Sequence, residues 1–231
     1  MSQVEKSEGL NLSRVVFLGR TWEEYLLIFN LSKGDLLGRK VLDCPSGACS
    51  FTAHANQHGA DGTATDIAYY FEVDDLERKG SQDIDYVMQS LGQAKNYYNW
   101  NYFKNVDELK NARIRALTDC NIDMRKFGVG CYVPAILPQL PFADSQFDLT
   151  LSAHFLFTYA DRLNFDFNIQ TIKELIRVTK DEIRFFPTVD MTGKRCEYMG
   201  TLIDWVRDRG WVAEEIQVHY EFKRMPILCS S

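Results

Sequence analysis

The sequence has no apolar run long enough to cross a membrane, and its first ten residues lack the apolar core of a secretion signal. It also has no excess of basic residues: 26 Lys and Arg stand against 32 Asp and Glu, for a net charge of −6. A polyanion such as nucleic acid would be repelled unless a local basic patch attracted it, and none is visible. These absences predict a cytoplasmic protein that binds neither nucleic acid nor membranes. They leave its oligomeric state open.

The cysteines follow no spacing that is typical of a metal site. No two of the six have CxxC spacing, and no histidine lies at a zinc-finger interval from any of them. We therefore expect free thiols in a reducing compartment and no bound metal ion.

What the sequence does contain is an alternation of apolar and amphipathic segments. Strands are predicted at residues 40–43, 62–67, 131–133, 147–152 and 182–186. Helices are predicted at residues 22–29, 51–58, 165–178 and 195–209, and a closing hairpin at 212–222 and 227–229. This order predicts an α/β fold: a doubly wound, mostly parallel, Rossmann-like sheet with a terminal antiparallel hairpin.

We expect a single domain over residues 1–231, with two elaborations. Residues 1–34 form an N-terminal helical cover, whose helix begins at a capping box made by Thr21 and Glu24. Residues 68–130 form a helical insertion between the second and third strands, longer than a simple crossover needs.

Within the insertion, Ser81 and Asn105 are predicted helix starts, and an aromatic run includes Tyr98, Trp100 and Tyr102. Insertions of this length commonly roof an active site, so these aromatic side chains could line a substrate pocket. Equally, they could be a small core that packs the insertion on the sheet. Stacking on nucleic acid bases is disfavoured by the acidic composition.

Carboxylates follow two of the predicted strands at the point where each strand ends. Asp43 closes the first strand, and Asp66 closes the second, one turn–helix–turn unit later. Because a carboxylate has two acceptor oxygens, Asp66 can bind both hydroxyls of a ribose. The alternative is that Asp66 caps a helix or lies in a solvated turn. Its pairing with the first loop favours ribose.

The loop after the first strand, Pro45-Ser46-Gly47, limits which molecule carries that ribose. A pyrophosphate needs several glycines whose N–H groups surround it, but this loop has only Gly47, and Pro45 has no N–H. S-adenosylmethionine carries no phosphate, and it needs one close backbone approach and one acid. The loop therefore favours this cofactor over NAD.

Two segments resemble class I S-adenosylmethionine-dependent methyltransferases. VLDCPSGAC at 41–49 is similar to the first motif of that family, an acid followed by a glycine loop, although Pro45 and Cys49 replace its outer glycines. LPFADSQFDL at 140–149 resembles the loop and fourth strand of the ubiquinone-biosynthesis-like branch. The resemblance covers roughly residues 36–70 and 131–229, and it implies S-adenosylmethionine as cofactor.

The resemblance also implies where the cofactor lies. The family's acid after the third strand is replaced here by an apolar stretch, so adenine is expected between backbone groups and apolar side chains. Cofactor contacts are expected from Asp43, Pro45, Ser46, Gly47, Asp66, Ile67, Ala135, Ile136, Leu137, Ser152 and Ala153.

The methionine carboxylate of the cofactor needs a cation, because an unpaired buried charge is costly. Arg20 precedes the capped helix that carries Tyr25, and we expect Arg20, with Tyr25, to close over this carboxylate. The alternative is that Arg20 is solvated and Tyr25 packs with Phe29.

His154 lies at the end of the fourth predicted strand, followed by Phe155. It is a candidate general base, with Phe155 in the substrate pocket; the alternative is a histidine packed in the core. Together these patterns predict methyl transfer to a small-molecule acceptor by in-line displacement at the sulfonium methyl. Two alternatives stay open: a non-catalytic S-adenosylmethionine-binding protein, and an oxidoreductase that binds NAD.

Overall fold

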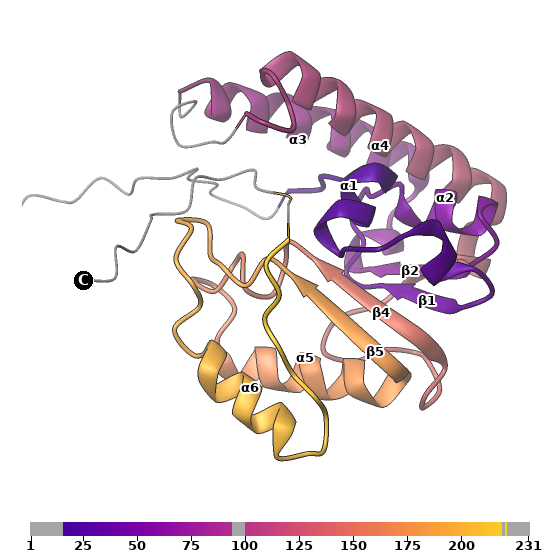
Figure 1. The fold of residues 1–231 in the computed structure, drawn as a ribbon. Coiled ribbons are helices and arrows are strands. Elements are labelled where there is room, and N and C mark those ends of the chain that lie inside the picture. Colours follow the sequence, from indigo (N-terminus) through magenta and orange to yellow (C-terminus); the bar gives the residue numbers. More distant parts are fainter. Residues whose placement is uncertain (1–15, 94–99, 219, 221–231) are drawn as a thin grey trace, which may run out of the picture.

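The computed structural model describes residues 16–93, 100–218 and 220. Within them, parallel strands form one five-stranded sheet in the order β3-β2-β1-β4-β5 (Figure 1). The strands are β1 (Lys40–Asp43), β2 (Asp61–Asp66), β3 (Tyr132–Pro134), β4 (Phe147–Ala153) and β5 (Thr179–Phe186). The predicted α/β fold with a doubly wound, Rossmann-like sheet is confirmed.

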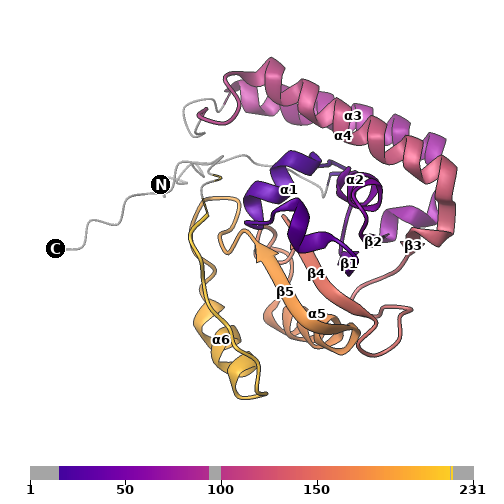
Figure 2. The same cartoon turned by 45° about the vertical axis from the view of Figure 1, so that its right-hand side comes forward.

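Helices cover both faces of this sheet, as two views agree (Figures 1 and 2). One side carries α1 (Trp22–Ile28), α2 (Phe51–Gln57), α3 (Val73–Gln93) and α4 (Val106–Phe127). The other side carries α5 (Phe165–Val178) and α6 (Met199–Arg207). Short 3-10 turns are η1 (Lys33–Leu36), η2 (Ile67–Tyr70) and η4 (Gly128–Gly130).

The central strands are apolar on both faces because helices cover both. Val41 and Leu151 pack towards α1 and α2, whereas Leu42 packs with α5. Each of the three is fully buried. β1 pairs with β2 on one side and with β4 on the other, so the chain reverses its direction of winding beside β1. Ligands of such sheets bind at the carboxyl ends of the strands near this point.

Two of the predicted helix starts are confirmed, and one is wrong. Thr21 and Glu24 form the capping box of α1, and the Asn105 side chain caps α4 by accepting from the Glu108 N–H. Ser81 instead lies inside α3, where its hydroxyl donates to the Glu77 carbonyl. The apolar side chains of α3 pack as one continuous stripe, and that packing outweighs the local capping preference of a serine.

The predicted closing hairpin is not found in the described part of the chain. Residues 212–218 form no strand, and residues 221–229 lie outside the described residues. A strand needs a neighbour for its backbone groups. The described contacts of this segment are instead to side chains: Arg207 donates to the Ala213 carbonyl, and Arg195 pairs with Glu215.

Candidate functional site

A cavity of about 1290 Å³ opens at the carboxyl ends of the strands. Its walls come from the segment 16–20, which we call the strap, from the loops after β1 and β3, and from the ends of β2, β4 and β5. Helices α3, α4, α5 and α6 and the segments 187–193 and 211–218 also contribute lining residues. The strap lies tightly against the first loop: a Cβ on Gly19 would come within 1.8 Å of the Ala48 carbonyl oxygen. Only glycine fits there.

The first loop uses its own backbone donors within the protein. The N–H groups of Cys44, Ser46 and Gly47 donate to Leu151, Thr65 and Asp66, each at 2.9 Å. Pro45 has no N–H. Gly47 has a positive φ of 57°, which favours glycine, and it lines the cavity with Pro45 and Ser46. The loop therefore has few N–H groups left for a phosphate.

Asp66 lies at the carboxyl end of β2 and lines the cavity. Its two oxygens accept from different N–H groups, Gly47 at 2.9 Å and Ala68 at 2.8 Å. Burial raises the pKa of Asp66, against these two hydrogen bonds. Since each oxygen has a second lone pair, the fixed carboxylate can still accept from a ligand's hydroxyls.

Apolar side chains flank Asp66 at one end of the cavity. Ile67 and Ile136 line it and are 56% and 57% exposed, an unusual exposure for isoleucine. Leu137 also lines the cavity, whereas Ala135 is buried against α5. The pair of isoleucines provides a surface on which a planar ring can lie.

Asp43 and Tyr25, both expected at the ligand, lie beneath the loop rather than at the cavity. The Tyr25 hydroxyl donates to Asp43 at 2.9 Å, and the Ser46 hydroxyl donates to its other oxygen at 2.7 Å. Burial raises the pKa of Asp43 to about 7, although these hydrogen bonds lower it. Tyr25 stacks on Phe51 and packs edge-on with Phe29. Asp43 is connected to the cavity wall through its hydrogen bond from Ser46, which lines the cavity.

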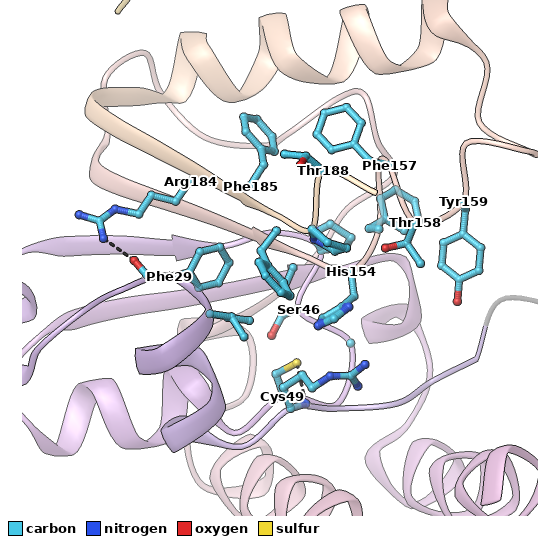
Figure 3. A pocket seen from close by; sticks show the side chains of 18 of the residues that line it. Phe29, Ser46, Cys49, His154, Phe157, Thr158, Tyr159, Arg184, Phe185 and Thr188 are labelled. Carbon is cyan, nitrogen blue, oxygen red and sulfur yellow. Dashed lines mark hydrogen bonds between the residues drawn. The ribbon is translucent and has the colours of Figure 1, made fainter. Parts of the chain in front are cut away.

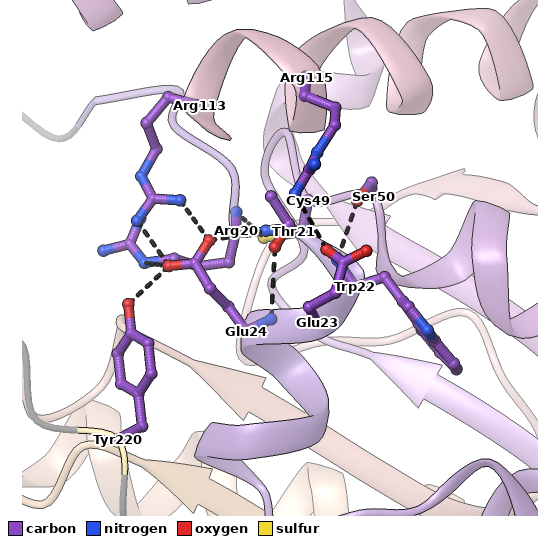
Figure 4. A network of polar contacts seen from close by, with 10 residues as sticks. All are labelled: Arg20, Thr21, Trp22, Glu23, Glu24, Cys49, Ser50, Arg113, Arg115 and Tyr220. Atoms are coloured by element: carbon purple, nitrogen blue, oxygen red, sulfur yellow. Dashed lines mark hydrogen bonds and ion pairs between the residues drawn. The ribbon is translucent and has the colours of Figure 1, made fainter. Parts of the chain in front are cut away.

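A buried ionic cluster forms the wall next to the strap (Figure 4). Arg113 of α4 pairs with Glu24 through both terminal nitrogens, at 2.5 and 2.7 Å, and the Tyr220 hydroxyl donates to Glu24 at 2.6 Å. Arg20 Nε lies 3.9 Å from the same carboxylate. Burial alone would raise the pKa of Glu24, but the charge and hydrogen bonds of Arg113 lower it to about 2.

This cluster holds two guanidinium groups and one carboxylate, so it carries excess positive charge. Arg20 and Arg113 both line the cavity, and the Arg20 side chain is 15% exposed. Burial and the nearby Arg113 lower the pKa of Arg20. A buried cation without a full partner is costly. The wall therefore favours an anionic group in the cavity.

His154 follows β4 directly and lines the cavity between two sets of residues (Figure 3). Ser46 and Cys49 lie on one side of it, and Phe157 and Phe185 on the other. It has a positive φ of 53°, a conformation that costs a non-glycine residue about 1–2 kcal/mol. Its N–H donates to the Phe186 carbonyl at 2.6 Å. Strain of this kind is frequent at functional sites.

The other predicted site residues are divided. Ala153 and Phe155 line the cavity, whereas Ser152 is buried in β4. Trp100 packs against the core between α3, α4 and β2, and Tyr102 lies edge-on to Phe103 and Tyr220; neither is among the residues that line the cavity. Tyr98 lies outside the described residues. The insertion lines the cavity instead through side chains of α3 and α4: Asp75, Leu76, Lys79, Val87, Met88, Leu91, Leu109 and Arg113.

Sequence reasoning missed the partners of Glu24. Glu24 was visible only as a helix cap, and Arg113 and Tyr220 lie 89 and 196 residues further along the chain. No local pattern links residues at such separations. One signal was present: Arg113 falls among Leu109, Ala112, Ala116 and Leu117 on the buried face of α4, and a buried arginine needs a carboxylate.

Among the described residues, no group of three or more His, Cys, Asp or Glu could hold a metal ion, and no helix is long and apolar enough to cross a membrane. No protein-family model matches the chain. Its sequence is 36% identical over 216 residues to the uncharacterized protein MJ0045 of Methanocaldococcus jannaschii, which covers 93% of this chain and 94% of that protein. The chain belongs to the MJ0045 family.

A comparison with solved structures finds a chain of similar fold for this MJ0045 family member. The crystal structure of a SAM-dependent methyltransferase from Aquifex aeolicus matches it with a TM-score of 0.42 and 16% sequence identity. The match covers 84% of this chain and 87% of that one.

Proposed function

We propose that the protein binds S-adenosylmethionine across the carboxyl ends of β1, β2 and β3, and transfers its methyl group to a small-molecule acceptor beside His154. The proposal depends on two neighbouring features: the Asp66 carboxylate, and a first loop whose backbone N–H groups mostly donate to other parts of the protein. Asp66 supplies acceptors for a ribose, and the loop leaves few N–H groups to surround a pyrophosphate. A nucleoside without phosphate fits this combination.

The remaining walls fit the two ends of this cofactor. Ile67 and Ile136 offer apolar surfaces for adenine, with Leu137 beside them. At the other end, the excess charge of Arg20 and Arg113 supports the methionine carboxylate. We therefore place Arg20 on that carboxylate, and we assign Tyr25 and Asp43 to supporting the loop.

Catalysis would depend chiefly on holding the acceptor in line with the sulfonium methyl and excluding water. The acceptor's nucleophile forms a bond to the methyl carbon as the bond from that carbon to sulfur breaks, leaving S-adenosylhomocysteine. An acceptor O–H or N–H must also lose its proton, and we propose that His154 takes it.

Binding of S-adenosylhomocysteine tests the cofactor assignment. The ligand should raise the melting temperature of the protein, because it binds the folded state alone. Asp66→Asn should lose most of this shift, whereas Asp61→Asn, on an exposed residue at the other end of β2, should keep it. Asp66 also accepts hydrogen bonds from two loop N–H groups, so its replacement can change the melting temperature by itself. Each ligand-induced shift in melting temperature is therefore measured against the same variant without ligand. Asp66→Glu, which keeps a carboxylate, is a second variant. A shift with NADH and none with S-adenosylhomocysteine would contradict the proposal.

The proposed base is tested separately. His154→Ala should bind S-adenosylhomocysteine like the wild type and lose at least about tenfold in methyl transfer, since a general base contributes roughly 10²–10⁴-fold. Transfer is measured from methyl-labelled cofactor. Undiminished transfer in His154→Ala would return His154 to a packing role.

A further inference from the structure

The wall of the cavity that faces α5 and α6 differs from the wall that faces the insertion. Every α5 or α6 side chain that lines the cavity is apolar: Phe167, Ile172, Ile176, Met199, Leu202, Ile203 and Val206. The α3 and α4 wall instead includes Asp75, Lys79 and Arg113. We call the part of the cavity that these seven side chains line the apolar compartment.

The apolar compartment is continuous with the site at His154. Phe155 and Phe157 follow His154 in the chain and line the same cavity. Phe157 and Phe185 lie edge-on with ring centroids 5.9 Å apart, on the side of His154 away from Ser46 (Figure 3). A molecule that reaches His154 can therefore extend past these two rings.

A buried water needs two to four polar partners, and the α5 and α6 side chains that line the cavity offer none. Cavities lined by leucine, isoleucine and phenylalanine bind apolar molecules. Near His154 the wall includes a polar residue: Thr158 lines the cavity, and its hydroxyl oxygen is buried and has no hydrogen-bond partner among the described residues. Such an atom is costly unless a ligand satisfies it.

We propose that the apolar compartment binds the aliphatic chain of an amphiphilic methyl acceptor, whose polar head lies between His154 and Thr158. The identity of this ligand as the acceptor rests on the proposed methyl transfer. The compartment itself, as a site for an aliphatic chain, does not.

The test uses cis-parinarate, an aliphatic chain that fluoresces when it leaves water for an apolar site, with 1-decanol as an uncharged competitor. Ile176→Trp fills the compartment from α5, and Val206→Trp fills it from α6. Ile169→Trp is the matched control, because Ile169 is also a partly buried isoleucine of α5 but does not line the cavity. Binding of S-adenosylhomocysteine is measured in each variant by calorimetry.

We expect Ile176→Trp and Val206→Trp to weaken parinarate binding at least tenfold, with Ile169→Trp within twofold of the wild type. All three should bind S-adenosylhomocysteine within twofold of the wild type. Equal parinarate binding in the filled and control variants would overturn the proposal, as would a failure of 1-decanol to displace the probe. If the wild type bound parinarate but not S-adenosylhomocysteine, the proposed function would fail and the aliphatic site would stand.

Discussion

Glu24 and Asp43 are both fully buried carboxylic acids on the α1 side of the sheet, and their surroundings differ in one respect. Glu24 is held by the guanidinium of Arg113, and its pKa lies at about 2 (Figure 4). Asp43 is held by two hydroxyl groups, those of Tyr25 and Ser46, and its pKa lies at about 7. Both acids have hydrogen bonds to each oxygen, so hydrogen bonding alone does not keep a buried carboxylate ionised.

The different partners and pKa values of Glu24 and Asp43 indicate that the two acids have different structural roles. Glu24 is a permanent anion that holds two arginines in the cavity wall, where their excess charge can meet an anionic ligand. Asp43 is about half protonated near pH 7, because its pKa lies at about 7, and it connects α1 to the first loop through Tyr25 and Ser46.

The largest loss of folding stability is expected from breaking the buried ion pair between Glu24 and Arg113. Glu24→Gln leaves the Arg113 guanidinium buried without a counter-charge, which should lower the free energy of unfolding by about 3–5 kcal/mol. Glu23→Gln is the control on the same helix, because Glu23 pairs with Arg115 at the surface, where the side chains are 55% and 59% exposed. It should cost at most about 1 kcal/mol. Chemical unfolding at pH 7 measures both, and equal losses would show that the buried pair adds nothing.

A smaller effect is expected from the titration of Asp43. Its pKa is raised in the folded state, so its contribution to stability is complete below about pH 4 and is lost as pH rises towards about 7. The loss is at most about 4 kcal/mol, at ~1.4 kcal/mol per pKa unit. Asp43→Asn should remove this dependence, since the Tyr25 and Ser46 hydroxyls can turn to accept from an amide. The free energies of unfolding of the wild type and of Asp43→Asn, measured from pH 4 to 8, test this expectation. Parallel curves for the two proteins would contradict the raised pKa of Asp43.

The smallest expected effect is on ligand affinity rather than on folding stability. Arg20→Gln should weaken S-adenosylhomocysteine binding about 10- to 100-fold, from the ~1.5–3 kcal/mol of a hydrogen bond to a charged group. Adenosine lacks the methionine carboxylate, so its affinity should not change. Arg39→Gln, at the opposite end of β1, is the control. If Arg20→Gln weakened adenosine equally, Arg20 would support the site without contacting the carboxylate.

Much of the fold could be predicted because its signals are local. The capping box of Thr21 and Glu24 depends on residues three apart, and the strands ending at Asp43 and Asp66 follow from short buried runs. Helix α3 was harder, because a serine in its middle is typical of a helix start, whereas the tertiary packing of a long apolar stripe determined the outcome.

The candidate site was predictable at the strand ends and not elsewhere. Asp66, Gly47 and His154 line the cavity because any parallel sheet brings the carboxyl ends of its strands to one edge. Whether Asp43 faces the ligand or the core depends on Tyr25, which approaches from a helix 18 residues earlier in the chain. Motif position alone does not contain that information.

The bond between Tyr220 and Glu24 has a consequence for how the protein is made. A ribosome synthesises Glu24 early, Arg113 89 residues later and Tyr220 196 residues later. Until Arg113 emerges, the carboxylate has no guanidinium from α4 and is better left in water. A contact that spans so much of the chain forms only after a large loss of loop entropy. The charged wall of the cavity is therefore complete only once Tyr220 has been synthesised, because a nascent chain that has not reached Tyr220 lacks the hydroxyl that donates to Glu24.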